Sequence, residues 1–239
     1  QYLSLQHPTI TDYDESIALA TGAVQVTVTR TDGDGDKVST STNIGSQIKF
    51  EDDGPTAPTL ALNTDGMVTH DESAGLQTGS IGEVAPPAED NNDNDVAGPL
   101  AVFNNITTPN GTTPGVDPDM AVGFATGAAA VVTLSGGSFG ADGAAAAGAT
   151  AYALGVTDAT FAGVSTTAGT QIFLYNGAGP NAGLILGRVG TEGGGTDTAN
   201  ATGEVAFALA IAPATGVVSI AQYLSLQHPT ITDYDESIA

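Results

Sequence analysis

The stretch Ala23-Val24-Gln25-Val26-Thr27-Val28-Thr29 decides the fold class, because apolar and polar residues alternate along it with a period of two. Successive side chains of a β-strand point to opposite faces, so the three valines share one face and the polar residues the other. Similar runs, separated by turn-forming residues, predict strands at residues 38–50, 121–124, 129–134, 151–156, 170–175, 184–189, 204–211 and 217–226. Many short strands with Gly-rich turns predict an all-β fold, an antiparallel β-sandwich. The best candidate for a helix is a short turn near residues 11–20, where Asp12 or Asp14 could cap it.

The composition excludes several classes of function. The 239 residues include 27 acidic side chains against 4 Lys and Arg, which gives a net charge of −23. Nucleic acids and anionic membranes attract basic surfaces, so neither is an expected partner. The chain has no Cys, which excludes disulfides and thiolate metal sites, and no apolar run long enough for a membrane-spanning helix. Because 41% of the residues are apolar, we expect one or two folded domains rather than disorder.

An internal repeat sets the domain organisation. Residues Gln1–Ala18 and Gln222–Ala239 are the same eighteen letters, QYLSLQHPTITDYDESIA, at an offset of 221 residues. Chance does not produce such an identity, so the sequence predicts a tandem array of near-identical modules with that period. The period is far longer than a solenoid repeat, and each unit is therefore expected to be one sandwich or a pair of subdomains.

A module boundary is expected after residue 54. The run Glu51-Asp52-Asp53-Gly54-Pro55-Thr56-Ala57-Pro58 ends a strand-like segment in acids, Gly and two prolines, which is typical of a stiff, extended linker. We therefore predict that residues 1–54 are the C-terminal part of one module and that 55–58 form the linker. Residues 59–239 would be most of the next module, with 222–239 repeating 1–18.

The motif Asp32-Gly33-Asp34-Gly35-Asp36 is the first candidate metal site. Carboxylates at alternate positions with Gly between them allow a tight loop to point several hard oxygens at one centre, as Ca²⁺ requires. No Glu follows at the twelfth loop position, so the motif is not an EF-hand. A plain acidic hairpin turn is the alternative, since Asp-Gly is a common turn dipeptide.

A second candidate calcium site combines the acids of the linker with acids early in the next module. They are Glu51, Asp52, Asp53, Asp71 and Glu72. Consecutive carboxylates repel one another unless water or a cation compensates them, so Ca²⁺ clamping the junction and simple solvation are both open. The remaining acidic groups are expected to be solvated loops or acids at the start of a helix. These groups are Asp90, Asp93 and Asp95, and Asp12, Asp14 and Glu15.

Catalytic motifs are weak throughout the sequence. His7, His70 and His228 are the only histidines, and His7 and His228 occupy the same repeat position. His70-Asp71-Glu72-Ser73 contains the letters of a catalytic triad, but neighbouring residues of one segment cannot adopt triad geometry. We therefore expect no enzymatic activity.

Several motifs resemble the long tandem repeats of giant RTX-type bacterial adhesins that are exported by type I secretion. They are given in the order of the repeat, in which the end of one period continues into residue 19 of the next. They are Gly187-Arg188-Val189, Ala206-Phe207-Ala208-Leu209, Thr215-Gly216-Val217-Val218, Gln222-Tyr223-Leu224, the Asp32–Asp36 motif, Asp52-Asp53-Gly54-Pro55 and His70-Asp71-Glu72-Ser73-Ala74-Gly75. The resemblance is to the VCBS, Ig-like or cadherin-like class of repeat. It implies an Ig-like sandwich, calcium-dependent rigidity and a cell-surface or secreted location. The calcium-binding nonapeptide of RTX toxins is absent, so their β-roll is not implied.

The expected function is that of a structural spacer in an extracellular adhesin or surface filament, stiffened by calcium. Its expected partners are neighbouring identical modules, with lateral self-association into fibres also possible in such arrays. A multivalent carbohydrate- or partner-binding module and a domain of a secreted hydrolase are the alternatives. A salt-adapted acidic surface without bound calcium is a rival explanation of the charge alone.

Overall fold

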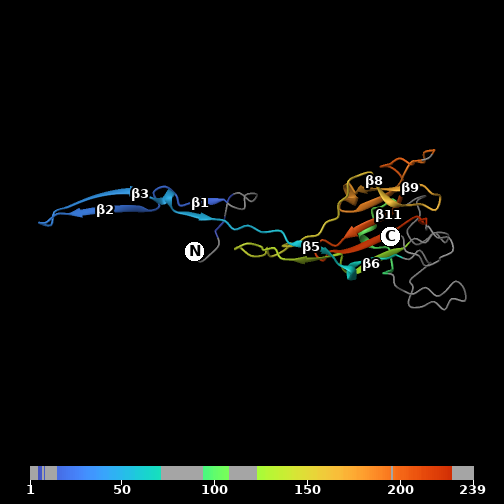
Figure 1. Cartoon of the computed structure of the whole chain (residues 1–239), viewed down its shortest axis with the longest axis horizontal. Helices are drawn as coiled ribbons and strands as arrows, with labels where there is room; N and C mark the ends of the chain where they lie inside the picture. The colour runs from blue at the N-terminus through green and yellow to red at the C-terminus, as the bar shows by residue number, and fades with distance from the viewer. Residues whose placement is uncertain are drawn as a thin grey trace. The chain divides into compact units, whose positions relative to one another are not determined.

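The computed structural model describes residues 5–6, 8, 15–70, 94–107, 123–194 and 196–227 (Figure 1). The chain divides into two compact units. The first consists of residues 1–60 with 134–149, and the second of residues 61–133 with 150–239. Within the described residues no helix is both long and apolar enough to cross a bilayer.

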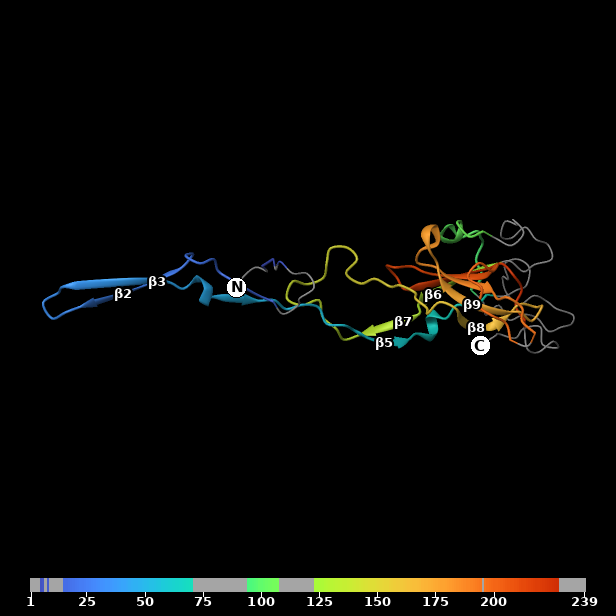
Figure 2. The same ribbon diagram turned by 90° about the horizontal axis from the view of Figure 1, so that it is seen from above.

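The first unit is built from two antiparallel strand pairs. Strand β1 (Ser16–Ala18) pairs with β4 (Lys49–Glu51), and β2 (Gln25–Thr31) forms a hairpin with β3 (Lys37–Asn43). A short 3-10 helix, η1 (Gly45–Gln47), connects β3 to β4. The hairpin is drawn as a long ribbon beyond β1 and β4 in Figures 1 and 2.

The β2–β3 hairpin has one apolar and one polar face. In its register Val26 lies opposite Thr42 and Val28 opposite Thr40, and paired residues share a face of the ribbon. On the other face hydroxyl groups pair across the strands, Thr27 with Ser41 at 2.8 Å and Thr29 with Ser39 at 2.7 Å. The predicted alternation is therefore present.

The second unit contains a six-stranded antiparallel sheet in the order β6-β12-β11-β10-β9-β8. Its strands are β6 (Phe124–Ala130), β8 (Thr160–Ser165), β9 (Gln171–Asn176), β10 (Ile185–Val189), β11 (Val205–Ile211) and β12 (Val217–Gln222). The strands from β8 to β12 pair in chain order, and β6 closes the far edge against β12. Gly216, at a φ of +73°, provides the left-handed residue that the tight β11–β12 turn requires.

Short elements complete the described chain. Strand β5 (Thr59–Leu62) pairs with β7 (Val132–Ser135) in a separate two-stranded sheet. The 3-10 helices η2 (Thr64–Gly66), η3 (Ala101–Phe103) and η5 (Gly179–Asn181) lie in the connections. Gly66 of η2 lies so close to the backbone of Ala130 that a Cβ atom would collide with its carbonyl oxygen.

The hydrophobic core lies on the six-stranded sheet. The buried cluster consists of Phe103, Ile106, Phe124, Leu184, Leu186, Val205, Ala208, Ala210, Ala221 and Tyr223, with Val96 and Leu100 packed against it. Segment 94–107 therefore covers one face, and the rings of Phe103 and Phe124 stack with their centroids 6.4 Å apart. Ile185 and Leu186 are consecutive in β10 and each is only 3% exposed, so both faces of that strand are covered.

This architecture confirms the predicted all-β, antiparallel class and is consistent with a β-sandwich. Three local predictions were wrong. Residues 38–50, predicted as one strand, are divided between β3 and β4 by the 3-10 helix η1. Residues 16–18, expected near a helical turn, form β1, because Ile17 pairs with Phe50 of β4. Residues 151–156 form no strand. Tyr152 instead donates its backbone N–H to the carbonyl of Pro213, and the N–H of Val156 bonds the Asn176 side chain.

Candidate metal centre

The turn between β2 and β3 is organised by the carboxylate of Asp32. Its Oδ1 accepts the backbone N–H groups of Gly35 at 3.1 Å and Asp36 at 2.8 Å. The Asp32 N–H in turn donates to the carbonyl of Asp36 at 3.0 Å. Gly35 has a φ of +101°, a conformation that L side chains rarely adopt, so the Gly between two acids is a requirement of this turn.

The same turn brings three carboxylates together. Asp32, Asp34 and Asp36 each offer an oxygen within 4.8 Å of the other two, and all three residues are exposed. In the part of the chain that the structure describes, this is the one group of three or more His or acidic side chains that could hold a metal ion. Oxygen donors are the ligands that Ca²⁺ prefers, and an exposed site leaves room for water to complete six to eight ligands.

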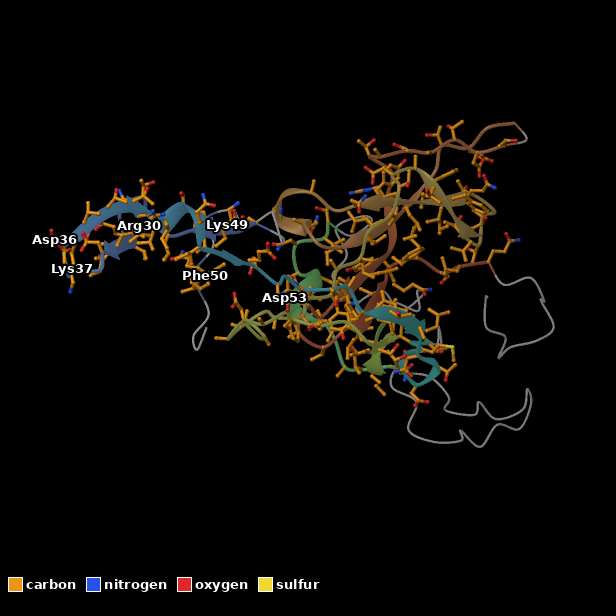
Figure 3. All side chains as sticks on the ribbon, turned by 60° about the vertical axis from the view of Figure 1, so that its left-hand side comes forward. Arg30, Asp36, Lys37, Lys49, Phe50 and Asp53 are labelled. Carbon is orange, nitrogen blue, oxygen red and sulfur yellow. The ribbon has the colours of Figure 1, made fainter. Side chains whose placement is uncertain are left out.

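Hydrogen bonding lowers the pKa of Asp32 below its ordinary value of 3.8. The largest cause is the hydrogen bond with the side chain of Asp34, and the backbone bond from Asp36 is the next. The Asp32 carboxylate is therefore ionised at neutral pH, in the form that a cation binds. Figure 3 places Asp36 and Lys37 at the tip of the hairpin, with Arg30 further along the ribbon, so two cationic side chains accompany the three carboxylates.

The linker acids are arranged differently. Glu51 ends β4, and Asp52 donates its backbone N–H to the carbonyl of Glu15 at 3.1 Å. The Asp52 carboxylate accepts the N–H of Asp53 at 2.9 Å. Successive residues of an extended chain point to opposite sides, so Glu51, Asp52 and Asp53 form no three-residue ligand group among the described residues. Asp71 and Glu72, the other two predicted ligands, lie outside the described residues.

A buried pair of His70 and Asp95 was missed by the sequence analysis. The Nδ1 atom of His70 lies 2.7 Å from Oδ1 of Asp95, and the two side chains are 4% and 6% exposed. The prediction of a solvated loop is therefore wrong for Asp95. Gly123 makes room for the pair, since a Cβ there would collide with the imidazole ring.

The pair connects two segments that are distant in sequence. Beside it, the backbone of Thr69 and the side chain and backbone of Asn94 exchange two hydrogen bonds of 2.9 Å. Asp95 itself forms a β-bridge with Ala125 of β6. No sequence motif predicts this pair, because the two residues lie 25 positions apart and share no motif. Its role in this geometry is to fix the segments to the sheet.

The chain matches no curated protein and no solved structure. One family model matches residues 1–45 and 67–239, which is most of the chain, and its description is "Domain of unknown function (DUF5801)". The match begins again after a gap that contains the predicted linker at 55–58. The chain therefore belongs to the DUF5801 family of domains.

Proposed function

We propose that the chain is a repeating structural module of an extracellular bacterial adhesin or surface filament, stiffened by calcium. The observation that carries the proposal is the identity of residues 1–18 and 222–239 in an all-β chain. Repetition of a whole module favours a spacer, because a single ligand site needs no copies unless avidity is used. The resemblance to RTX-type adhesin repeats supports a secreted or surface location. The role is mechanical rather than catalytic.

The charge of the chain supports calcium as the stiffening ion. A net charge of −23 opposes the compact state through self-repulsion, and bound divalent cations relieve it. The Asp32, Asp34 and Asp36 group supplies carboxylates that a local turn already holds together. Binding of Ca²⁺ there would stabilise the tip of the β2–β3 hairpin, since a ligand that binds only the folded state stabilises that state.

The test is calcium binding by a variant that retains the turn. Asp32 accepts the backbone bonds of the turn and is left unchanged, whereas Asp34→Asn with Asp36→Asn removes the other two carboxylates. The control is Asp142→Asn with Glu192→Gln, two exposed acids outside the cluster whose loss changes the net charge equally. Titration calorimetry and thermal melting are measured with Ca²⁺ and with EGTA at fixed ionic strength.

We expect Ca²⁺ to raise the melting temperature of the original chain and of the control. The cluster variant should lose one calcium-binding site in calorimetry. It should also lose the part of the increase in melting temperature that calcium at this site causes. If all three proteins melt at the same temperature with Ca²⁺ and with EGTA, calcium does not stiffen the module. If the cluster variant keeps every site, the calcium is bound elsewhere.

A further inference from the structure

The apolar face of the β2–β3 hairpin is left exposed in the first unit. We call it the valine face; it consists of Val26, Val28, Arg30, Val38, Thr40 and Thr42. Val26, Val28 and Val38 are 41%, 54% and 70% exposed. An isolated two-stranded hairpin is at best marginally stable in water, and its stability normally comes from packing its apolar face on another layer. The polar face has its own hydroxyl pairs, so the valine face is the side that needs a partner.

The internal repeat identifies that partner. Residues 222–227 have the same sequence as residues 1–6, and in the second unit they are bound by the six-stranded sheet. Gln222 pairs with Phe207, the N–H of Tyr223 donates to the carbonyl of Ala206 at 2.7 Å, and Leu226 bridges Thr166. Tyr223 is only 1% exposed, and Leu226 is partly buried. Leu5, the copy of Leu226, is 36% exposed.

Leu5 is therefore exposed, whereas Leu226 at the same position of the repeat is partly buried. In an array, the copy at 1–6 would be bound by the sheet of the preceding module as 222–227 is bound here. Only residues 19–24 separate the end of the repeated segment at Ala18 from β2. The hairpin is therefore tethered within a few residues of a segment whose other copy directly continues β12 of the six-stranded sheet.

We propose that the valine face docks on the six-stranded unit of a second copy of this chain, the copy that precedes the hairpin in the array. The hairpin is then the last layer of a module whose body lies in the preceding period. Packing of the three valines drives the docking. Arg30, which pairs with Val38 toward the tip of the hairpin, is the one charged side chain of the face. This inference rests on the tandem organisation of the proposed function and not on calcium binding.

The experiment uses a two-copy chain, residues 1–239 continued by residues 19–239, which keeps the natural 18-residue junction. The chain has no native cysteine, so one introduced thiol reports one position. Val28→Cys lies on the valine face and Thr29→Cys on the polar face, and each is placed in the first or in the second hairpin. The rate of maleimide labelling is measured for all four proteins, with Ca²⁺ and with EGTA.

In the second hairpin we expect the thiol at 28 to react at least about tenfold more slowly than the thiol at 29, because a covered thiol reacts only after local opening. In the first hairpin the two rates should be similar. Equal rates at 28 in both hairpins would overturn the proposal, whatever calorimetry reports about calcium. Val38→Cys with Lys37→Cys as its control repeats the test on β3, in case the change at 28 disturbs the fold.

Discussion

Tyr223 is a buried residue of the repeated segment 222–239. It follows β12, and its ring is fully buried in the core of the second unit. Burial raises the pKa of its hydroxyl well above the ordinary value of 10.0. Among the described residues the hydroxyl has no hydrogen-bond partner, although the atom is inaccessible to water. The residue therefore combines a favourable aromatic contact with an unfavourable buried polar atom.

Replacing Tyr223 by Phe is expected to stabilise the chain. The change keeps the ring and removes a buried hydroxyl whose desolvation costs on the order of 1–3 kcal/mol when it is unpaired, so the free energy of unfolding should stay level or rise by about 1 kcal/mol. Denaturant unfolding followed by circular dichroism measures it. Tyr223→Ala is the packing control and should cost roughly 3–5 kcal/mol. A clear loss of stability in the Phe variant would show that the hydroxyl is hydrogen-bonded.

The His70–Asp95 pair permits a second prediction at this scale. His70→Ala removes the imidazole and takes one hydrogen-bond partner from a carboxylate that is 6% exposed. Hydrogen bonds to charged groups contribute about 1.5–3 kcal/mol, so the variant should lose about that much stability. Removing both members in H70A/D95A should cost less than the sum of the two single changes, and a double-mutant cycle measures the difference. Strict additivity would mean that the two side chains do not interact.

At the scale of elements, the β2–β3 turn should respond to pH. The folded-state pKa of Asp32 is depressed by the Asp34 side chain and then by backbone bonds, relative to 3.8. A depressed pKa contributes stability that is present above the ordinary value and is lost as the pH falls below about 4. The protection factors of the Gly35 and Asp36 amides, which are the intrinsic exchange rates at each pH divided by the rates measured by NMR, should therefore fall between pH 7 and pH 3. Asp32→Asn should abolish that pH dependence, and a variant that retains it would place the titrating group elsewhere.

Local patterns of apolar residues in the sequence predicted several strands at nearly their observed positions. The alternating valines predict β2, and the predicted runs at 170–175, 184–189 and 204–211 fall within two residues of β9, β10 and β11. Strands β5 and β8 were not predicted, because Thr59–Leu62 is only four residues long and Gly163 interrupts Thr160–Ser165. Tertiary pairing formed them, as it formed β1.

The candidate sites follow the same division between local and tertiary causes. Asp32, Asp34 and Asp36 come together because one tight turn contains all three, so their spacing alone predicts the cluster. The linker acids at 51–53 are equally close in sequence, yet extended backbone separates their side chains. The His70–Asp95 pair needs β6 to hold Asp95 in place, and no spacing rule contains that information.

At the scale of the whole molecule, two physical accounts explain an acidic surface. In one, clustered carboxylates bind calcium specifically, and in the other, general screening by salt relieves the repulsion. They differ in their dependence on the cation. Screening depends on ionic strength, whereas specific binding saturates and adds about 1.4 kcal/mol per site when free calcium is tenfold above its Kd. Melting at equal ionic strength in CaCl₂ and in NaCl therefore separates them.

For the two-copy chain we expect low-millimolar CaCl₂ to raise the melting temperature more than NaCl of the same ionic strength. The calcium effect should saturate, and MgCl₂ should reproduce little of it, since Mg²⁺ is smaller and gives up its water reluctantly. If the melting temperature rises equally with CaCl₂ and with NaCl of the same ionic strength, the acidic surface is adapted to salt in general. Calcium would then have no specific part in stiffening the module. That result would leave the docking of the valine face standing, because burial of apolar side chains requires no bound cation. Docking between copies would then be the remaining source of rigidity, and thiol protection at position 28 in EGTA would show it acting alone.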